Sequence, residues 1–130
     1  MLNGAGFEWD VHCPLAVAEG VGMGVLGEVR DRDGDWKWIG EGTSSGLESR
    51  PGGPDDPDEE ERIVLAYADA MTRDVVVGEG LFERVRGMLG DRGTVELTAA
   101  VAGYNCVSRF LVALDVGERN GVAVGKWKIE

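Results

Sequence analysis

The hydrophobic residues of this chain recur at helical spacing over most of its length, and glycines separate the helical segments. The first segment covers residues 7 to 19 and ends at Gly20. It contains Pro14, which is expected to kink the helix because proline removes one backbone hydrogen bond. A short second helix is expected over residues 23 to 30. The core-facing stripe predicted for the first helix consists of Phe7, Val11, Leu15 and Ala18.

A third helix is predicted over residues 57 to 72. Asp56 provides a capping carboxylate, Pro57 suits the first turn, and acidic residues follow at the positive end of the helix dipole. Residues 81 to 89 predict another amphipathic helix that ends near Gly90. The inner stripe predicted for the third helix consists of Ile63, Ala66, Tyr67, Ala70 and Met71.

The last predicted helix, residues 95 to 114, is apolar on nearly every side, which is typical of a helix that other helices surround. Asp91 or Thr94 can cap it. Polar groups within such a helix need partners or a cavity, because burying them alone costs free energy. Together these segments predict an all-α fold in a single domain over residues 1 to 130.

Two parts of the chain do not follow the helical pattern. Residues 31 to 58 are rich in Gly, Ser, Pro and Asp and predict a long surface loop, either a functional lid or a disordered insertion. Residues 122 to 129 alternate weakly and predict a short strand or an arm, which could pack on a neighbouring subunit.

The formal net charge of -11 argues against binding to nucleic acids or anionic membranes, because both are bound through clustered lysines and arginines. No segment is apolar over the roughly 18 to 20 residues that span a bilayer, and we expect no leader segment. The two cysteines, Cys13 and Cys106, match neither a disulfide framework nor a zinc site, and we expect both to be buried as small hydrophobic residues. These features predict a cytoplasmic protein in a reducing compartment.

Glu8 and His12 are the first candidate site residues. His12 is the only histidine, and the two residues lie four positions apart, so they share one face of a helix and can exchange a proton or hold a ligand. The alternative is a surface pair without chemistry. Arg109 is likewise a candidate ligand-binding residue or a partner for an acid such as Glu96 or Asp69 in a structural ion pair.

The run Glu8-Trp9-x-x-His12, followed by Ala16 and Gly20, resembles the signature of the carboxymuconolactone decarboxylase family, within the alkylhydroperoxidase D-like superfamily. The similarity covers about residues 6 to 116, apart from residues 31 to 58, which look like an insertion. Later segments are similar to the family's later helices in order and spacing. These segments are Leu65-Ala66-Tyr67-Ala68-Asp69, Leu81-Phe82, Val95-Glu96-Leu97, Tyr104-Asn105-x-x-x-Arg109 and Leu114.

The resemblance implies an alkylhydroperoxidase D-like helical bundle around an antiparallel helical hairpin. It implies a homo-oligomer, either a dimer, trimer or hexamer, with active sites near subunit contacts and no cofactor. The chain begins shortly before Glu8, so this resemblance predicts a domain that is abbreviated at its N-terminus or completed by a partner subunit. The peroxidase branch carries Cys-x-x-Cys-x-x-x-His, which places its cysteines at Ala5 and Glu8 when His12 is aligned. Thiol chemistry would then require Cys13 and Cys106 to meet in space.

Within this resemblance, a carboxylated lactone or related oxygenated ring compound would lose carbon dioxide by acid–base chemistry, in a setting such as secondary metabolism. His12 is the expected proton donor, Glu8 orients it and favours its charged form, and Tyr104 stabilises charge on the ring carbonyl. Arg109 holds a substrate carboxylate with help from Asn105.

Several alternatives stay open. The same acid–base residues would serve an isomerase, a dehydratase or a cyclase, and a non-catalytic oligomeric accessory protein is a separate class. Tyr104 can also be a core residue, and Trp9 can be a wall of the substrate cavity or a subunit contact. The lyase hypothesis expects the imidazole, the acid and the guanidinium to converge on one enclosed hollow.

Overall fold

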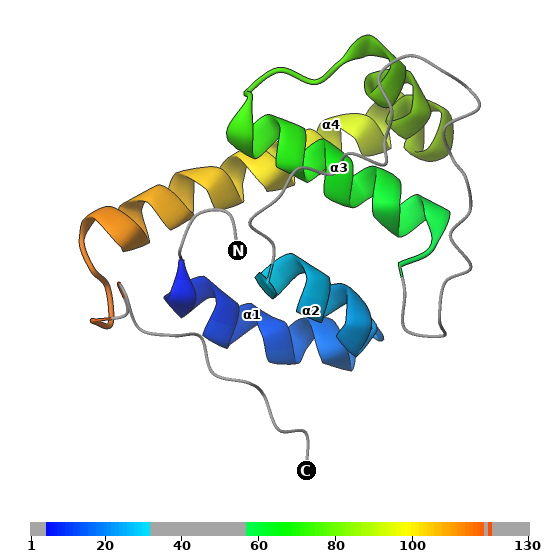
Figure 1. Cartoon of the computed structure of the whole chain (residues 1–130). Helices are drawn as coiled ribbons and strands as arrows, with labels where there is room; N and C mark the ends of the chain where they lie inside the picture. Colours follow the sequence, from blue (N-terminus) through cyan, green and yellow to red (C-terminus); the bar gives the residue numbers. More distant parts are fainter. Residues whose placement is uncertain (1–4, 32–56, 119, 121–130) are drawn as a thin grey trace.

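The computed structural model describes residues 5–31, 57–118 and 120. Within these ranges the chain is mostly helical and contains no strand, in agreement with the predicted all-α class. Figure 1 shows α1 and α2 beside one another, below the pair formed by α3 and α4. The four helices are α1 (Gly6–Ala18), α2 (Met23–Asp31), α3 (Glu59–Arg73) and α4 (Glu79–Ala113). The helices predicted over residues 7 to 19, 23 to 30 and 57 to 72 are confirmed to within about two residues. The two helices predicted over residues 81 to 89 and 95 to 114 belong to one element, α4, because residues 91–94 are helical as well.

The main apolar core lies between α3 and α4. Ile63 and Tyr67 on α3 are buried against Val85, which is 0% exposed in the first section of α4. This burial confirms the centre of the predicted inner stripe of α3, because Ala66 is buried as well. Partly buried side chains complete the core: Met71, Val77, Leu81, Met88 and Leu97.

Two polar contacts connect α3 with the second section of α4. The Tyr67 hydroxyl lies 2.8 Å from Thr98 Oγ1, and Asn105 Nδ2 donates to Thr72 Oγ1 at 2.9 Å. Residue numbers rise together along both helices, so this section of α4 runs in the same direction as α3, as Figure 1 also shows. These two segments therefore do not form the antiparallel hairpin that the resemblance implied.

The start of α3 differs from the predicted one. Asp58 is the N-cap, because its carboxylate accepts from the Glu61 backbone N–H at 2.8 Å while the Glu61 side chain accepts from the Asp58 N–H at 3.0 Å. This capping box satisfies two backbone donors that the first turn leaves free. Pro57 precedes the cap and is buried, so the prediction that it lies in the first turn was wrong. The predicted cap, Asp56, lies outside the described residues.

A break at Gly90 divides α4 into two sections. Gly90 has φ 69° and ψ 175°, a backbone conformation that is essentially restricted to glycine. The predicted helix end near Gly90 is therefore confirmed. Thr94 is buried in the following turn, where its hydroxyl donates to the Gly90 carbonyl at 2.8 Å, a different role from the predicted N-cap.

The predicted core stripe of α1 was wrong. Phe7, Val11 and Leu15 are all exposed, Leu15 by 57%, whereas Gly6 and Cys13 on the other side of the helix are buried. The buried side of α1 therefore carries small residues, although they are less hydrophobic than those on its exposed side. The helix also continues through Pro14.

The prediction that residues 95 to 114 are enclosed on all sides was also wrong. Val95, Phe110 and Leu114 are 67%, 64% and 70% exposed. Among the described elements, α3 makes the main contact with α4, and one neighbouring helix covers only part of a helix surface. The buried residues after the break are polar, namely Thr94 and Ser108.

Two further predictions concern segments that lie mostly or wholly outside the described residues, the loop at residues 31 to 58 and the strand or arm at residues 122 to 129. They stay predictions. No helix in the described part of the chain is long and apolar enough to cross a membrane.

The break in α4 leads to a test of stability with a matched pair of glycines. Neither Gly90 nor Gly87 has an atom within 4 Å of an added Cβ, but only Gly90 has a positive φ. We expect Gly90→Ala to lower the free energy of unfolding by roughly 1–3 kcal/mol because alanine is strained there. Gly87→Ala should raise it by roughly 0.5–1 kcal/mol, since alanine favours a helix. Urea unfolding measures both, and equal effects of the two substitutions would contradict the strained break.

Candidate functional site

The contact between α1 and α4 contains two of the predicted catalytic residues. His12 on α1 and Tyr104 on α4 have ring centroids 5.2 Å apart, with an angle of 86° between the ring planes. This edge-to-face geometry is a favourable arrangement of two aromatic rings. Both residues are exposed, Tyr104 by 53%, so Tyr104 is not a core residue and both rings can meet a ligand from solvent.

Glu8 lies one helical turn before His12 and is half-buried. Its Oε1 is buried and has no hydrogen-bond partner in the described part of the protein. Burial raises the pKa of the Glu8 carboxyl above its ordinary value of 4.5, and the nearby His12 charge acts in the opposite direction. Glu8 therefore interacts with His12 through charge, and no hydrogen bond to Glu8 Oε1 holds the imidazole in place.

Trp9 follows Glu8 on the same helix and is also half-buried. Its indole Nε1 is buried, again without a hydrogen-bond partner among the described residues. Helical spacing places Trp9 on the side of α1 that carries buried Cys13, four residues later. Trp9 is thus part of the packed side of α1 and is a neighbour of the site rather than an exposed binding group.

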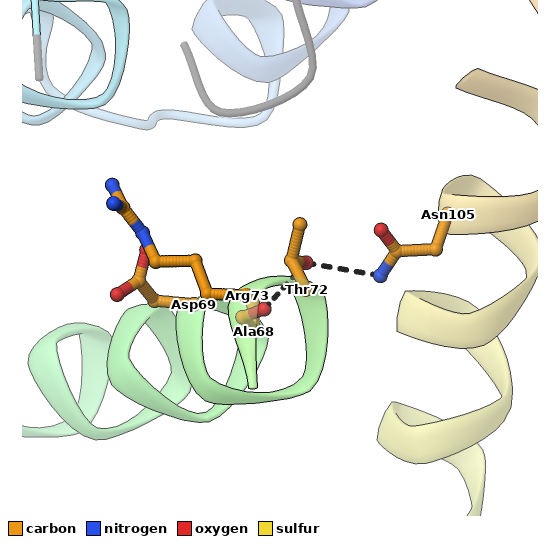
Figure 2. Close-up of polar contacts among 5 residues, drawn as sticks. All are labelled: Ala68, Asp69, Thr72, Arg73 and Asn105. Carbon is orange, nitrogen blue, oxygen red and sulfur yellow. Dashed lines mark hydrogen bonds and ion pairs between the residues drawn. The ribbon is translucent and has the colours of Figure 1, made fainter. Parts of the chain in front are cut away.

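Arg109 and Asn105 form the second pair of predicted site residues. Arg109 Nη1 donates to the Asn105 side-chain Oδ1 at 3.0 Å and to the Asn105 backbone carbonyl at 2.8 Å. Asn105 also reaches across to α3, where its Nδ2 donates to Thr72 Oγ1 (Figure 2). The predicted association of Arg109 with Asn105 on one helix face is present in the structure.

The alternative partners proposed for Arg109 are paired with other arginines. Asp69 accepts from Arg73 Nε at 2.8 Å, and Glu96 accepts from Arg92 Nε at 2.7 Å. Within the described residues, the side-chain hydrogen bonds of Arg109 go only to neutral oxygens of Asn105. The structural ion pair that the sequence left open is therefore not formed with either of these acids.

The candidate site residues form two separate pairs in the structure, His12 with Tyr104 and Asn105 with Arg109. Tyr104 and Arg109 are five residues apart on α4, which corresponds to about 7.5 Å along the helix and about 140° around it. His12 and Arg109 are both exposed, so the described residues do not form the enclosed hollow that was expected. A ligand that contacts both pairs would have to lie across the surface of α4.

The cysteines give no sign of paired thiol chemistry. Both are free, and Cys13 is buried as predicted, whereas Cys106 is exposed, contrary to prediction. Cys106 lies on the side of α4 that no other described helix covers, which explains its exposure. In the described part of the chain, no group of three or more His, Cys, Asp or Glu residues is arranged to hold a metal ion.

Thr72 is a residue of the site that the sequence pattern did not indicate. Its hydroxyl donates to the Ala68 carbonyl at 2.7 Å and accepts from Asn105, so Thr72 connects α3 to the residue that holds Arg109 (Figure 2). The sequence gives little indication of this role, because Thr72 lies outside the apolar stripe of α3 and threonine is common on helix surfaces. Only the packing of α3 against α4 reveals the connection.

Comparison of the chain with protein-family models, with curated proteins and with solved structures finds no match. The resemblance to the carboxymuconolactone decarboxylase family therefore depends on the residues quoted above.

Proposed function

We propose that this chain is a cofactor-free lyase that resembles carboxymuconolactone decarboxylase and acts on a carboxylated lactone or a related oxygenated ring compound. The observation that carries the proposal is the contact of His12 with Tyr104 across α1 and α4, at 5.2 Å between ring centroids. It joins two groups able to donate a proton, from two segments that both belong to the family-like motifs.

The proposed reaction breaks the bond between a ring-system carbon and its carboxylate. The bonding electrons move into the conjugated ring carbonyl while neutral carbon dioxide departs. A proton then adds to a carbon atom of the resulting conjugated enolate. Donors directed at the carbonyl oxygen stabilise the negative charge that develops there. The His12 imidazole and the Tyr104 hydroxyl are suited to this task, and protonated His12 can also deliver the proton.

Arg109 is suited to hold a carboxylate that stays in the product. Its Nη1 makes both bonds to Asn105, so the Nε and Nη2 edge has no bond partner among the described residues. This edge presents two parallel donors that match a carboxylate. An arginine on the departing carboxylate would instead stabilise the substrate more than the transition state and slow the reaction.

We also propose that the protein assembles with copies of itself. The exposed side of α4 carries Val95, Phe110 and Leu114, and the smaller Ala99 and Gly103 lie between them at helical spacing. Val95, Phe110 and Leu114 are each at least 64% exposed. Monomeric proteins rarely expose a contiguous apolar patch above a few hundred Å², and a second copy presents the same apolar residues beside the exposed ion pair of Arg92 with Glu96.

Substitution of His12 tests the chemistry. We expect His12→Gln to lower kcat by roughly 10²–10⁴-fold, because a positioned proton donor contributes that much. The fold should survive, since His12 is exposed. The measurement is release of carbon dioxide from a panel of carboxylated γ-lactones, with circular dichroism as a check on folding. Glu19→Gln, at the exposed end of α1, is the control that should keep full activity. Product isomers without carbon dioxide would indicate an isomerase, and a fully active His12→Gln would contradict the acid–base role.

The raised pKa of Glu8 predicts a pH-dependent effect of Glu8→Gln on stability. Because burial disfavours the charged carboxylate, the native protein binds this proton more tightly than the unfolded chain does. The contribution of Glu8 is fully present below its ordinary pKa of 4.5 and is lost as the pH rises through the raised pKa. Glutamine does not titrate, so the stability of Glu8→Gln relative to the natural chain should increase across this range. Denaturant unfolding at several pH values measures it, and a pH-independent difference would refute the prediction.

Self-assembly is tested by introducing a charged side chain on the exposed side of α4. We expect Phe110→Asp to shift sedimentation equilibrium towards monomer, because burying an unpaired carboxylate in an interface is costly. Val76→Asp is the control, since Val76 is 72% exposed in the connection between α3 and α4. The proposal fails if the natural chain is monomeric at tens of micromolar, or if both variants behave alike.

A further inference from the structure

A chain of hydrogen bonds connects the backbone of α3 to the guanidinium of Arg109. The Thr72 hydroxyl donates to the Ala68 carbonyl at 2.7 Å, and Asn105 Nδ2 donates to Thr72 Oγ1 at 2.9 Å. Asn105 Oδ1 then accepts from Arg109 Nη1 at 3.0 Å. Figure 2 shows the first part of this relay, with Asn105 directed from α4 towards Thr72.

The chemistry of the donors fixes the orientation of the Asn105 amide. Thr72 has one hydroxyl proton, which is used on the Ala68 carbonyl, so Thr72 Oγ1 can only accept from Asn105. The guanidinium of Arg109 can only donate, so it requires the amide oxygen. Both ends demand the same orientation, with Nδ2 towards α3 and Oδ1 towards Arg109. Loss of the Thr72 acceptor would remove one of these two constraints.

The same bonds determine which edge of Arg109 faces a ligand. Nη1 carries two protons, and both are used, one on the Asn105 side chain and one on its backbone carbonyl. Rotation of the amide by half a turn would place Nδ2 against Nη1, where two donors repel. The guanidinium would then lose one bond and become free to reorient. The fixed orientation of the Nε and Nη2 edge of Arg109 thus depends on the Thr72 hydroxyl, which accepts from the Asn105 amide.

The charge of Arg109 is not neutralised by these contacts. Asn105 contributes only neutral oxygens, whereas several other arginines in the described part of the chain pair with carboxylates. These ion pairs are Arg73 with Asp69, Arg84 with Glu59, Arg86 with Asp91 and Glu83, and Arg92 with Glu96. Arg109 is therefore held by neutral groups, and these contacts do not cancel its positive charge.

We infer that Thr72 is a positioning residue for carboxylate binding: it fixes the Asn105 amide so that Arg109 presents its Nε and Nη2 edge to the ligand. Thr72 itself touches no ligand. The inference rests on the proposed function for the class of ligand, a ring compound with a carboxylate, but the relay itself can be measured without any ligand.

The variants are chosen to separate positioning from stability. Thr72→Val keeps the shape of the side chain and removes the acceptor, and Thr72→Ser restores a hydroxyl. Thr98→Val is the matched control, because Thr98 also donates to a carbonyl one turn earlier and contacts the Tyr67 hydroxyl between α3 and α4, but it does not reach Arg109. Thermal unfolding should show similar losses of stability for Thr72→Val and Thr98→Val.

The first readout is the NMR spectrum of the free protein. Arg109 Nε–Hε and the Asn105 side-chain amide are assigned with Arg109→Lys and Asn105→Asp. We expect Thr72→Val to shift both signals and to increase the mobility of the Arg109 signal, while Thr72→Ser and Thr98→Val leave them close to the natural positions. Unchanged signals in Thr72→Val would overturn the inference, whatever the protein binds.

The second readout is binding of γ-carboxy-γ-butyrolactone, followed through the Arg109 signal, with its neutral methyl ester as the comparison. Thr72→Val should raise Kd by about three- to tenfold, the usual effect of losing one supporting hydrogen bond, and Thr98→Val should leave Kd unchanged. Equal Kd values for Thr72→Val and the natural chain would also overturn the inference. If the relay signals respond as expected but the acid binds no better than its ester, the proposed function fails while the positioning of Arg109 stands.

Discussion

Packing between α3 and α4 is the constraint on which the rest of the described structure depends. Val85 is fully buried against Ile63 and Tyr67, and this core fixes the first section of α4. The break at Gly90 then lets the second section turn back along α3, where Tyr67 contacts Thr98. The position of every candidate site residue on α4 follows from this arrangement, since residues 104 to 109 lie on a section that these contacts orient.

Much of the fold was predictable because its signals are local. Glycine at a break and acids at a helix start act within one turn, so helix boundaries could be placed even though Asp58 rather than Asp56 proved to be the cap of α3. Burial could not be predicted in the same way. The stripe with Val11 and Leu15 was expected inside, yet α1 buries Gly6 and Cys13, because the side of a helix that becomes covered depends on where the rest of the chain packs against it.

The site shows the same division between local and distant contacts. The link from Asn105 to Arg109 joins residues four apart on one helix, and such a pair can be expected from sequence. The contacts of His12 with Tyr104 and of Thr72 with Asn105 span many residues and depend on how three helices pack. The sequence pointed to His12 because it is the only histidine and lies four residues after Glu8, and to Tyr104 through the family resemblance. Thr72 belongs to no such motif, so only the fold could reveal it.

The proposed binding of a carboxylate has to be reconciled with the net charge of -11 of this protein. Salt screens charges beyond about 8–10 Å at physiological ionic strength, so distant acids contribute little at Arg109, and nearby ones decide the potential there. Asp69 and Glu96, the two acids that the sequence offered as partners of Arg109, are each paired with another arginine. Among the described residues, the side-chain hydrogen bonds of Arg109 go only to neutral oxygens of Asn105, so these contacts leave its positive charge able to attract an anion. A carboxylate site is therefore physically compatible with the acidity of this chain, because the local pairing of charges and not their total determines the potential at the guanidinium.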